Sequence, residues 1–379
     1  MAAWLIFASA PPRAEAADGL LVGIHDDAQV LGNPTQAFPT LNTLRAQVIR
    51  VTMLWHEVAN TRPARGSDPT DPAYAWGVYD RVLVNAAANN IEVVFTIWGT
   101  PEWANGGRGP TYAPSKSHYL KAFAIAAQRR YSGALETVEY GVLPRVSKWT
   151  AWNEPNLHTF LRPQFQRMKK KGKKARFKRR SPAIYARICN AVVAGAHTAA
   201  SEAGFETQVA CGVTAPGGTN RGDARRPSIS PLPFLRGMKA RGAKFDVYAH
   251  HPYPQSPNEK PTDRPKAKSR ISLGSMWRLL RELERLYGDD VPVWITEYAY
   301  QTNPPDEILG VSPKKQSRYL RLAYGVALAN PKIEMLIWFL IQDERRAGDN
   351  LAQGWQSGLM TADGKKKTAF KTFRKLPHP

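Results

Sequence analysis

Short apolar runs alternate with longer amphipathic segments along this chain. Eight apolar runs are predicted to be β-strands: Leu20–His25, Gln47–Leu54, Glu92–Trp98, Lys148–Trp152, Thr207–Val213, Phe245–His250, Val291–Thr296 and Glu334–Ile341. Eight amphipathic segments, several with proline near their starts, are predicted to be helices: Pro39–Ala46, Gly77–Asn89, Lys116–Tyr131, Pro182–Ala203, Pro231–Arg241, Ser269–Tyr287, Pro313–Ala329 and Lys366–Arg374. This alternation predicts a parallel α/β architecture.

Eight strands and eight helices predict a single (β/α)8 barrel, a fold that routinely occupies a chain of this length. An open doubly wound sheet would carry a glycine-rich turn after its first strand, but His25-Asp26-Asp27 stands there. Stretches rich in proline and glycine at 105–114, 215–233 and 251–265 follow strands. Such loops build the C-terminal face of a barrel. We therefore expect residues 18–379 to form one barrel domain with long βα loops.

The first 17 residues have a different character. An apolar run from Met1 is followed by Ala-Glu-Ala at 14–16, the pattern with which a secretory signal ends. No positive residue precedes the run, so we expect the natural start upstream of Met1; a short buried N-terminal segment is the alternative. No other stretch approaches about 20 uninterrupted apolar residues, so no membrane span is expected. The signal pattern at residues 1–17 leads us to expect a secreted or cell-envelope location.

The net charge of +22 is extreme, and half of it lies in one segment. Residues 162–180 hold eleven Lys and Arg among nineteen positions and no acidic residue. We interpret the segment as a mobile basic loop beside the pocket entrance, because like charges repel. Three roles stay open: recruitment of an anionic glycan, binding of nucleic acid, and a merely solvated insertion. Nucleic acid is the least favoured, since Phe165 and Phe177 are the segment's only aromatic residues.

Cysteine and histidine give no metal-binding pattern. The two cysteines, Cys189 and Cys211, fall in a predicted helix and in the strand after it. They form either one disulfide or two buried thiols. The adjacent His250 and His251 have no third ligand at a plausible spacing. We expect neither a metal nor an organic cofactor.

Two glutamates carry the chemistry that the sequence predicts. Glu154 lies in Trp-Asn-Glu-Pro-Asn (152–156) and Glu297 in Trp-Ile-Thr-Glu-Tyr (294–298), 143 residues later, each at the end of a predicted strand. A barrel brings such strand ends into one pocket, and two facing carboxyl groups can cleave a glycosidic bond. Asn-Glu-Pro alone would favour the start of a helix. Its pairing with Thr-Glu-Tyr favours catalysis.

These motifs resemble those of the clan A glycoside hydrolases, family 39 most closely and the cellulase-like family 5 next. Further similar features are Arg50 on the second strand, Thr-Pro-Glu-Trp-Ala at 100–104, His-Pro-Tyr at 251–253, Trp338 on the eighth strand and the closing segment 358–370. The resemblance covers almost the whole chain. It implies a retaining mechanism, with Glu154 as the acid/base and Glu297 as the nucleophile.

The neighbours of the two glutamates have predicted roles in substrate binding. Arg50 is expected to keep Glu297 ionised, and Tyr253 or Tyr298 to donate a hydroxyl to it. Asn153 is expected to bind the sugar 2-hydroxyl. Adjacent strand residues point to opposite sides, and the resemblance selects His251 for the pocket.

Aromatic residues stand at several strand ends. Trp98, Trp103 and Trp338 are predicted to stack on sugar rings, packing at the barrel top being the alternative. His25, with Asp26, is predicted to bind a terminal sugar or else to form a solvated turn. The whole pattern predicts a retaining glycosidase acting on a carbohydrate, anionic if the basic segment takes part. The alternative is a barrel that binds carbohydrate or a polyanion without turnover. The sequence leaves the oligomeric state open.

Overall fold

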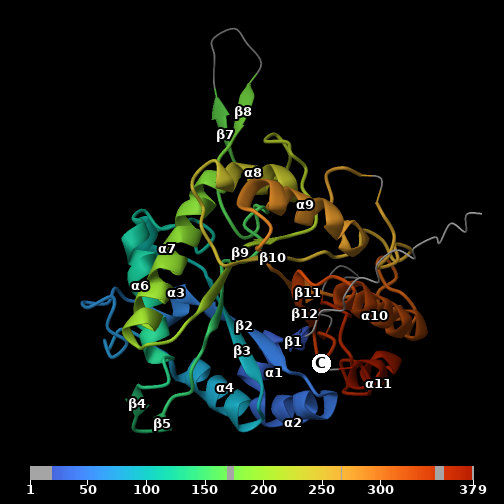
Figure 1. The fold of residues 1–379 in the computed structure, drawn as a ribbon, viewed down its shortest axis with the longest axis horizontal. Helices are drawn as coiled ribbons and strands as arrows, with labels where there is room; N and C mark the ends of the chain where they lie inside the picture. The colour runs from blue at the N-terminus through green and yellow to red at the C-terminus, as the bar shows by residue number, and fades with distance from the viewer. Residues whose placement is uncertain (1–18, 169–174, 266, 346–353, 378–379) are drawn as a thin grey trace, which may run out of the picture.

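The computed structural model describes residues 19–168, 175–265, 267–345 and 354–377, and its centre is a closed parallel barrel (Figure 1). The strands follow one another around it in the order β1-β12-β11-β10-β9-β6-β3-β2. Their bounds are β1 Leu21–His25, β2 Val48–Leu54, β3 Glu92–Trp98, β6 Lys148–Ala151, β9 Gln208–Thr214, β10 Val247–His250, β11 Val293–Tyr298 and β12 Ile333–Phe339. The predicted (β/α)8 fold is confirmed. The predicted signal segment, 1–17, lies outside the described residues.

Helices surround the barrel, and most predicted bounds agree within a few residues. The principal helices are α2 Pro34–Leu44, α4 Gly77–Ala88, α6 Ser117–Arg130, α7 Ser181–Glu202, α8 Pro231–Lys239, α9 Met276–Tyr287, α10 Pro313–Leu328 and α11 Thr368–Arg374. Shorter ones are α1 Asp27–Gly32, α3 Trp55–Val58, α5 Glu102–Asn105 and the 3-10 turn η1 Leu273–Ser275. None of the described helices combines the length and apolar character that crossing a bilayer requires.

Two predicted helix starts were wrong. The helix predicted from Pro39 begins at Pro34, and Pro39 lies inside it. Proline suits a first turn, and here the earlier proline occupies that position. The helix predicted from Ser269 begins only at Met276. Residues 269 and 270 instead belong to a loop that lines a cavity.

Alternate strand residues form two separate cores. The barrel interior is filled by a small cluster, whereas the other strand residues pack outward against the helices: the interior cluster is Val48, Val94, Ala210, Val213, Val247, Ala249, Trp294, Met335 and Ile337. This period of two predicts which side chains reach the pocket above the interior cluster. On β12, Met335 and Ile337 point inward, so Phe339 continues their row while Trp338 points outward.

The cysteines form a disulfide that joins α7 to β9. Cys189 and Cys211 have their Cα atoms 5.9 Å apart. Of the two alternatives that the sequence left open, the structure therefore has the bonded pair.

The described part of the basic segment forms a hairpin of β7 (Phe165–Met168) and β8 (Arg176–Arg179), which projects from the barrel in Figure 1. The segment that the sequence predicted as a loop therefore contains two paired strands. Every cation in the paired strands stands opposite an uncharged residue: Arg167 faces Phe177, Arg176 faces Met168, Lys178 faces Gln166 and Arg179 faces Phe165. This register avoids like charges directly across the ladder. A second hairpin, β4 Glu136–Thr137 with β5 Gly141–Val142, precedes β6.

Candidate active site

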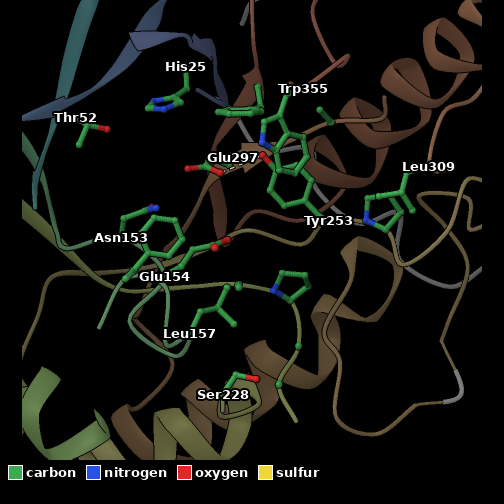
Figure 2. Close-up of a pocket in the computed structure, with 18 of the residues that line it drawn as sticks. His25, Thr52, Asn153, Glu154, Leu157, Ser228, Tyr253, Glu297, Leu309 and Trp355 are labelled. Carbon is green, nitrogen blue, oxygen red and sulfur yellow. Dashed lines mark hydrogen bonds between the residues drawn. The ribbon is translucent and has the colours of Figure 1, made fainter. Parts of the chain in front are cut away.

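A cavity of about 930 Å³ opens at the C-terminal ends of the strands, and Figure 2 shows both glutamates in it. Its wall includes six of the residues that the sequence proposed for the site: His25, Trp98, Asn153, Glu154, Tyr253 and Glu297. They come from β1, β3, β11 and the segments that follow β6 and β10. The barrel thus brings together side chains that are far apart in the sequence.

Glu154 lies in a tight turn directly after β6. Trp152 and Glu154 have φ angles of 75° and 35°, in the left-handed region that residues other than glycine seldom adopt. Strain of this kind persists only where the surroundings hold it. Asn156 supplies such a hold: its amide donates to the carbonyls of Ala215, Gly217 and Ile229 and accepts from the amide of Ala215. No helix starts at this turn, so the helix-start alternative is wrong. The role of Asn156 was missed.

Glu297 reaches the cavity because β11 contains a bulge. Ile295 pairs with Leu336, but Tyr298 pairs with Trp338, so β11 has one residue more than β12 between these pairs. Such an extra residue re-aims the side chains beside it. Glu297 joins the pocket, and Tyr298 turns outward into the core.

Arg50 uses its whole guanidinium fork beneath the cavity. Its Nη1 donates to Glu297 Oε1, its Nη2 donates to Asn153 Oδ1 (2.9 Å) and its Nε donates to Thr96 Oγ1 (2.8 Å). Because the Asn153 oxygen is occupied, its amide NH2 is the group that remains for a ligand. Arg50 itself is buried and does not line the cavity, so its predicted contact with substrate was wrong. It acts through Glu297 and Asn153.

His251 lies between the two carboxylates. Its Nδ1 is hydrogen-bonded to Glu154 Oε1 (3.0 Å) and lies 3.5 Å from Glu297 Oε2, while its Nε2 contacts Thr296 Oγ1 at 3.0 Å. The histidine is fully buried and outside the cavity wall, so it also orients the glutamates rather than contacting substrate. His250 points away, as predicted, and hydrogen-bonds Thr214 and the carbonyl of Ile271.

The two carboxyl groups have opposite pKa shifts. Burial raises the pKa of Glu154, helped by the negative charge of Glu297, although the hydrogen bond from His251 opposes this. Burial also acts to raise the pKa of Glu297, but His251 and Arg50 outweigh it and hold that pKa well below its ordinary value. Tyr253 adds a hydrogen bond from its hydroxyl to Glu297 Oε2 (3.1 Å). At neutral pH, this environment favours an ionised Glu297 beside a more readily protonated Glu154.

The separation of the carboxylates is short. One oxygen of each glutamate and one nitrogen of His251 all lie within 4.8 Å of one another. Retaining glycosidases hold their carboxyl groups about 5–5.5 Å apart, and inverting ones about 6.5–9.5 Å. These three side chains are also of types that bind metal ions, a grouping that the sequence did not reveal. The Arg50 guanidinium beside Glu297, however, places a positive charge where a cation would be held.

Three of the predicted aromatic contacts do not reach the cavity. The side chains of Trp338 on β12 and Tyr298 on β11 point away from the barrel interior. Both are buried, and they pack on each other with ring centroids 6.3 Å apart. Trp103 packs on Trp55 and donates from Nε1 to the carbonyl of Ala59 (2.8 Å). For Trp338 and Trp103, packing at the barrel top is the correct alternative. Of Tyr253 and Tyr298, Tyr253 is the residue that donates its hydroxyl to Glu297. Of the three tryptophans proposed for the site, Trp98 is the one that lies in the cavity wall.

Four other aromatic residues line the cavity and were missed: Phe160, Tyr300, Phe339 and Trp355. Phe339 follows the inward row of β12, so the period of two could have identified it. Trp355 is 41% exposed and lies against Tyr253 and Phe339, with centroids 5.8 and 5.4 Å away. Figure 2 shows Trp355 close to Glu297 and Tyr253. Its position in a long loop gave no signal in the sequence.

His25 and Asp26 have different environments. His25 lines the cavity, stacks on Phe339 and contacts the carbonyl of Arg50 through Nδ1 (3.0 Å). Burial lowers its pKa, which favours a neutral imidazole. Asp26 is buried and accepts from the backbone amides of Gln29, Ile341 and Gln342. Both predictions for Asp26, sugar binding and a solvated turn, were therefore wrong: it ties β1 to the loop after β12.

No protein-family model matches this sequence, and no curated protein matches it. Solved structures do match over nearly the whole chain. A family 39 glycoside hydrolase from Bacteroides cellulosilyticus WH2 has a TM-score of 0.61 at 15% identity, covering 93% of this chain and 62% of its own. The fold is that of the glycoside hydrolase barrels.

Two further neighbours are similar to the same extent. A glucosidase from Croceicoccus marinus has a TM-score of 0.61 at 13% identity, with 96% of this chain and 68% of that chain covered. GH5_18 from Streptomyces cattleya, solved with GlcNAc, has a TM-score of 0.58 at 15% identity, with 96% and 83% covered. The predicted resemblance to families 39 and 5 is thus confirmed in the fold. The chain spans 62% of the length of the family 39 enzyme.

Proposed function

We propose that this protein is a retaining glycoside hydrolase that cleaves O-glycosidic bonds of an oligosaccharide or polysaccharide. The observation that carries the proposal is the pair Glu154 and Glu297, close together in one cavity with opposite pKa shifts. Structural neighbours with the same fold are glycoside hydrolases, which supports this reaction class.

In the first step, the ionised Glu297 attacks the anomeric carbon. Glu154 donates its proton to the glycosidic oxygen, which departs as an alcohol, and an ester between the sugar and Glu297 results. Arg50 and Tyr253 hold the attacking carboxylate in place through their hydrogen bonds. The Asn153 amide oxygen accepts from Arg50, and its NH2 group binds the sugar hydroxyl next to the reacting carbon in this proposal.

In the second step, Glu154, now ionised, takes a proton from water as that water attacks the anomeric carbon of the sugar ester. Glu297 leaves as a carboxylate, and Glu154 regains its proton. His251 contacts both carboxyl groups and keeps their relative position through the cycle. Two inversions at one carbon give net retention.

The alternative of a barrel that binds carbohydrate without turnover gains no support from the site. Such a barrel would be expected to lack one of the carboxylates or the groups that orient them. Arg50 and Tyr253 are hydrogen-bonded to Glu297, and His251 is hydrogen-bonded to Glu154 and lies 3.5 Å from Glu297. An anionic glycan is the partner that the basic segment 162–180 favours.

We also propose that the protein is exported. The sequence pattern over 1–17 supports this, and so does the Cys189–Cys211 disulfide, because disulfides persist in oxidising compartments. Fractionation of the native host, followed by detection of the protein, tests the location. A purely cytosolic pool would contradict it.

The reaction is tested with aryl glycosides and with natural oligosaccharides in both anomeric configurations. The anomer released first is read by proton NMR before mutarotation. Retention of configuration by the native protein, with loss of turnover in Glu297→Gln, is the expected result. An inverted first product would reject the double displacement.

A further inference from the structure

Arg270 is a second arginine of the cavity, and the proposed reaction does not use it. It lies in the wall, in the loop between β10 and η1, and is partly buried. Its Nη2 donates to the carbonyl of Tyr253 (3.2 Å). Arg270 is thus bonded to the residue whose hydroxyl contacts Glu297.

The guanidinium of Arg270 has donors to spare. Its Nε is buried without a hydrogen-bond partner, and none of the ion pairs among the described residues includes Arg270. Burial lowers the pKa of Arg270, while the more distant Glu259 opposes this. Arginine nevertheless stays charged. A partly buried charge without a counter-ion is costly, so an anion from a ligand would stabilise it.

Gly217 lies directly against the Arg270 side chain and leaves room for it. A Cβ at Gly217 would lie 3.0 Å from Arg270 Nη1 and 3.1 Å from its Cγ, closer than ordinary packing allows. Gly217 lines the cavity as well. The absence of a side chain at 217 therefore shapes the wall around the guanidinium.

Further cations continue outward along the loop from β9 to α8. Thr219 and Ser228 line the cavity and close the base of this loop, where the Thr219 amide donates to Ser228 Oγ (2.9 Å). The exposed tip carries Arg221, Arg225 and Arg226. Arg221 pairs with Asp223, whereas Arg225 and Arg226 have no ion pair within the described part of the chain.

The β7–β8 hairpin adjoins the tip of the same loop. Gly222 lies against the Phe177 ring, so closely that a Cβ there would be 2.4 Å from it. The exposed cations of the hairpin thus extend a positive strip that begins at Arg270: they are Arg167, Arg176, Lys178 and Arg179. Phe165 and Phe177 are partly buried, so they offer little of the exposed aromatic surface on which nucleic-acid bases stack.

We propose, resting on the hydrolase function above, that the substrate is a polysaccharide of uronic acids. One sugar carboxylate binds Arg270 inside the cavity, and the sugars that follow lie along Arg225, Arg226 and the hairpin. The planar fork of arginine matches a carboxylate in two parallel hydrogen bonds. The exposed cations of the strip attract the chain over a longer range that salt screens.

Pairs of ligands that differ only in the sugar carboxylate test whether that group is recognised. Polygalacturonate, alginate and hyaluronan are each compared with their carboxyl-reduced forms, in which the uronates have become neutral hexoses. Affinity is measured by calorimetry in the background of Glu297→Gln, so that no ligand is consumed. Three variants are compared: Arg270→Gln, Arg270→Lys, and the four hairpin cations Arg167, Arg176, Lys178 and Arg179 changed to Gln. The control removes four exposed cations elsewhere, Lys314, Lys371, Arg374 and Lys375.

At least one acidic chain should bind about tenfold or more tightly than its reduced form. Arg270→Gln should abolish this preference, and Arg270→Lys should keep part of it, which also excludes a mere folding defect. The hairpin variant should weaken binding of the acidic chain only at low salt, and the control variant should not. Equal affinity for the acidic and reduced forms of all three chains would overturn the proposal. So would tighter binding of random-sequence DNA that depends on the hairpin.

Turnover by the native protein separates this inference from the proposed function. Cleavage of reduced chains alone would overturn the uronate proposal and leave the hydrolase intact. Arg270-dependent binding of an acidic chain with no cleavage of any substrate would instead reject the hydrolase.

Discussion

The floor of the cavity, where Arg50 contacts Glu297, and its rim, where Arg270 lies, differ in how their arginine side chains are bonded. On the floor, Arg50 is buried and each side of its guanidinium has a partner, one of them a carboxylate. On the rim, Arg270 keeps unused donors and has no ion pair within the described residues. Charges that compensate one another fix geometry, whereas uncompensated charges attract a partner. The comparison separates groups that perform chemistry from groups that select a substrate.

The largest effect on turnover should come from a substitution on the floor of the cavity. Glu297→Gln removes the nucleophile, so turnover should fall about 10⁴-fold or more, while the thermal midpoint stays near that of the native protein. Steady-state kinetics and thermal unfolding check both. Lys371→Gln, an exposed change on α11, serves as the control. A near-native rate in Glu297→Gln would reject this residue as nucleophile.

Glu154→Ala should slow the reaction according to the leaving group. Substrates with poor leaving groups need the proton and should lose about 10²–10⁴-fold, whereas activated aryl glycosides lose less in the first step. Added azide should restore part of the turnover on activated substrates, because the small anion replaces water without needing a base. An equal loss across leaving groups would count against the acid role.

Trp338, on the outer face of β12, and Trp355, in the cavity wall, should respond differently to substitution by alanine. Trp338→Ala empties a buried site outside the barrel and should lower the free energy of unfolding by about 3–5 kcal/mol. Trp355→Ala, at the exposed wall of the cavity, should raise KM about tenfold, or about 1.4 kcal/mol, with unfolding little changed. Denaturant titration and kinetics of both variants check this. The reverse pattern would show that the two tryptophans are wrongly placed.

A substitution of Arg50 on the floor should have a smaller effect, seen in the dependence of activity on pH. The rate should fall at low pH as Glu297 is protonated and fall again as rising pH removes the proton of Glu154, whose pKa is raised. Arg50→Gln removes a cation that lowers the pKa of Glu297, so the acidic limb should move to higher pH. The basic limb should move less, because burial is the main cause of the shift at Glu154. The dependence of kcat/KM on pH is the measurement, and an unmoved acidic limb would contradict the role of Arg50.

Much of the fold could be predicted because its signals are local. Each apolar run and each amphipathic segment carries its own period, and all eight predicted strands lie in the barrel. Glu154 and Glu297 follow from their places at strand ends, since parallel strands of a barrel end on one face. The two errors, at α2 and α9, concern the residues at which the helices begin. At α2 an earlier proline starts the helix, and at α9 the residues before Met276 belong to a loop and the 3-10 turn.

What the sequence alone determined is therefore the barrel and the identity of the paired carboxylates. Only the tertiary structure decided which way the neighbouring side chains point. The bulge in β11 sends Glu297 inward and Tyr298 outward, and the phase of β12 selects Phe339 over Trp338. Likewise, barrel closure places His251 between the glutamates, and the packing of Gly217 leaves Arg270 in the wall. The physical reason is that side-chain direction depends on register with a distant strand, which no local pattern contains.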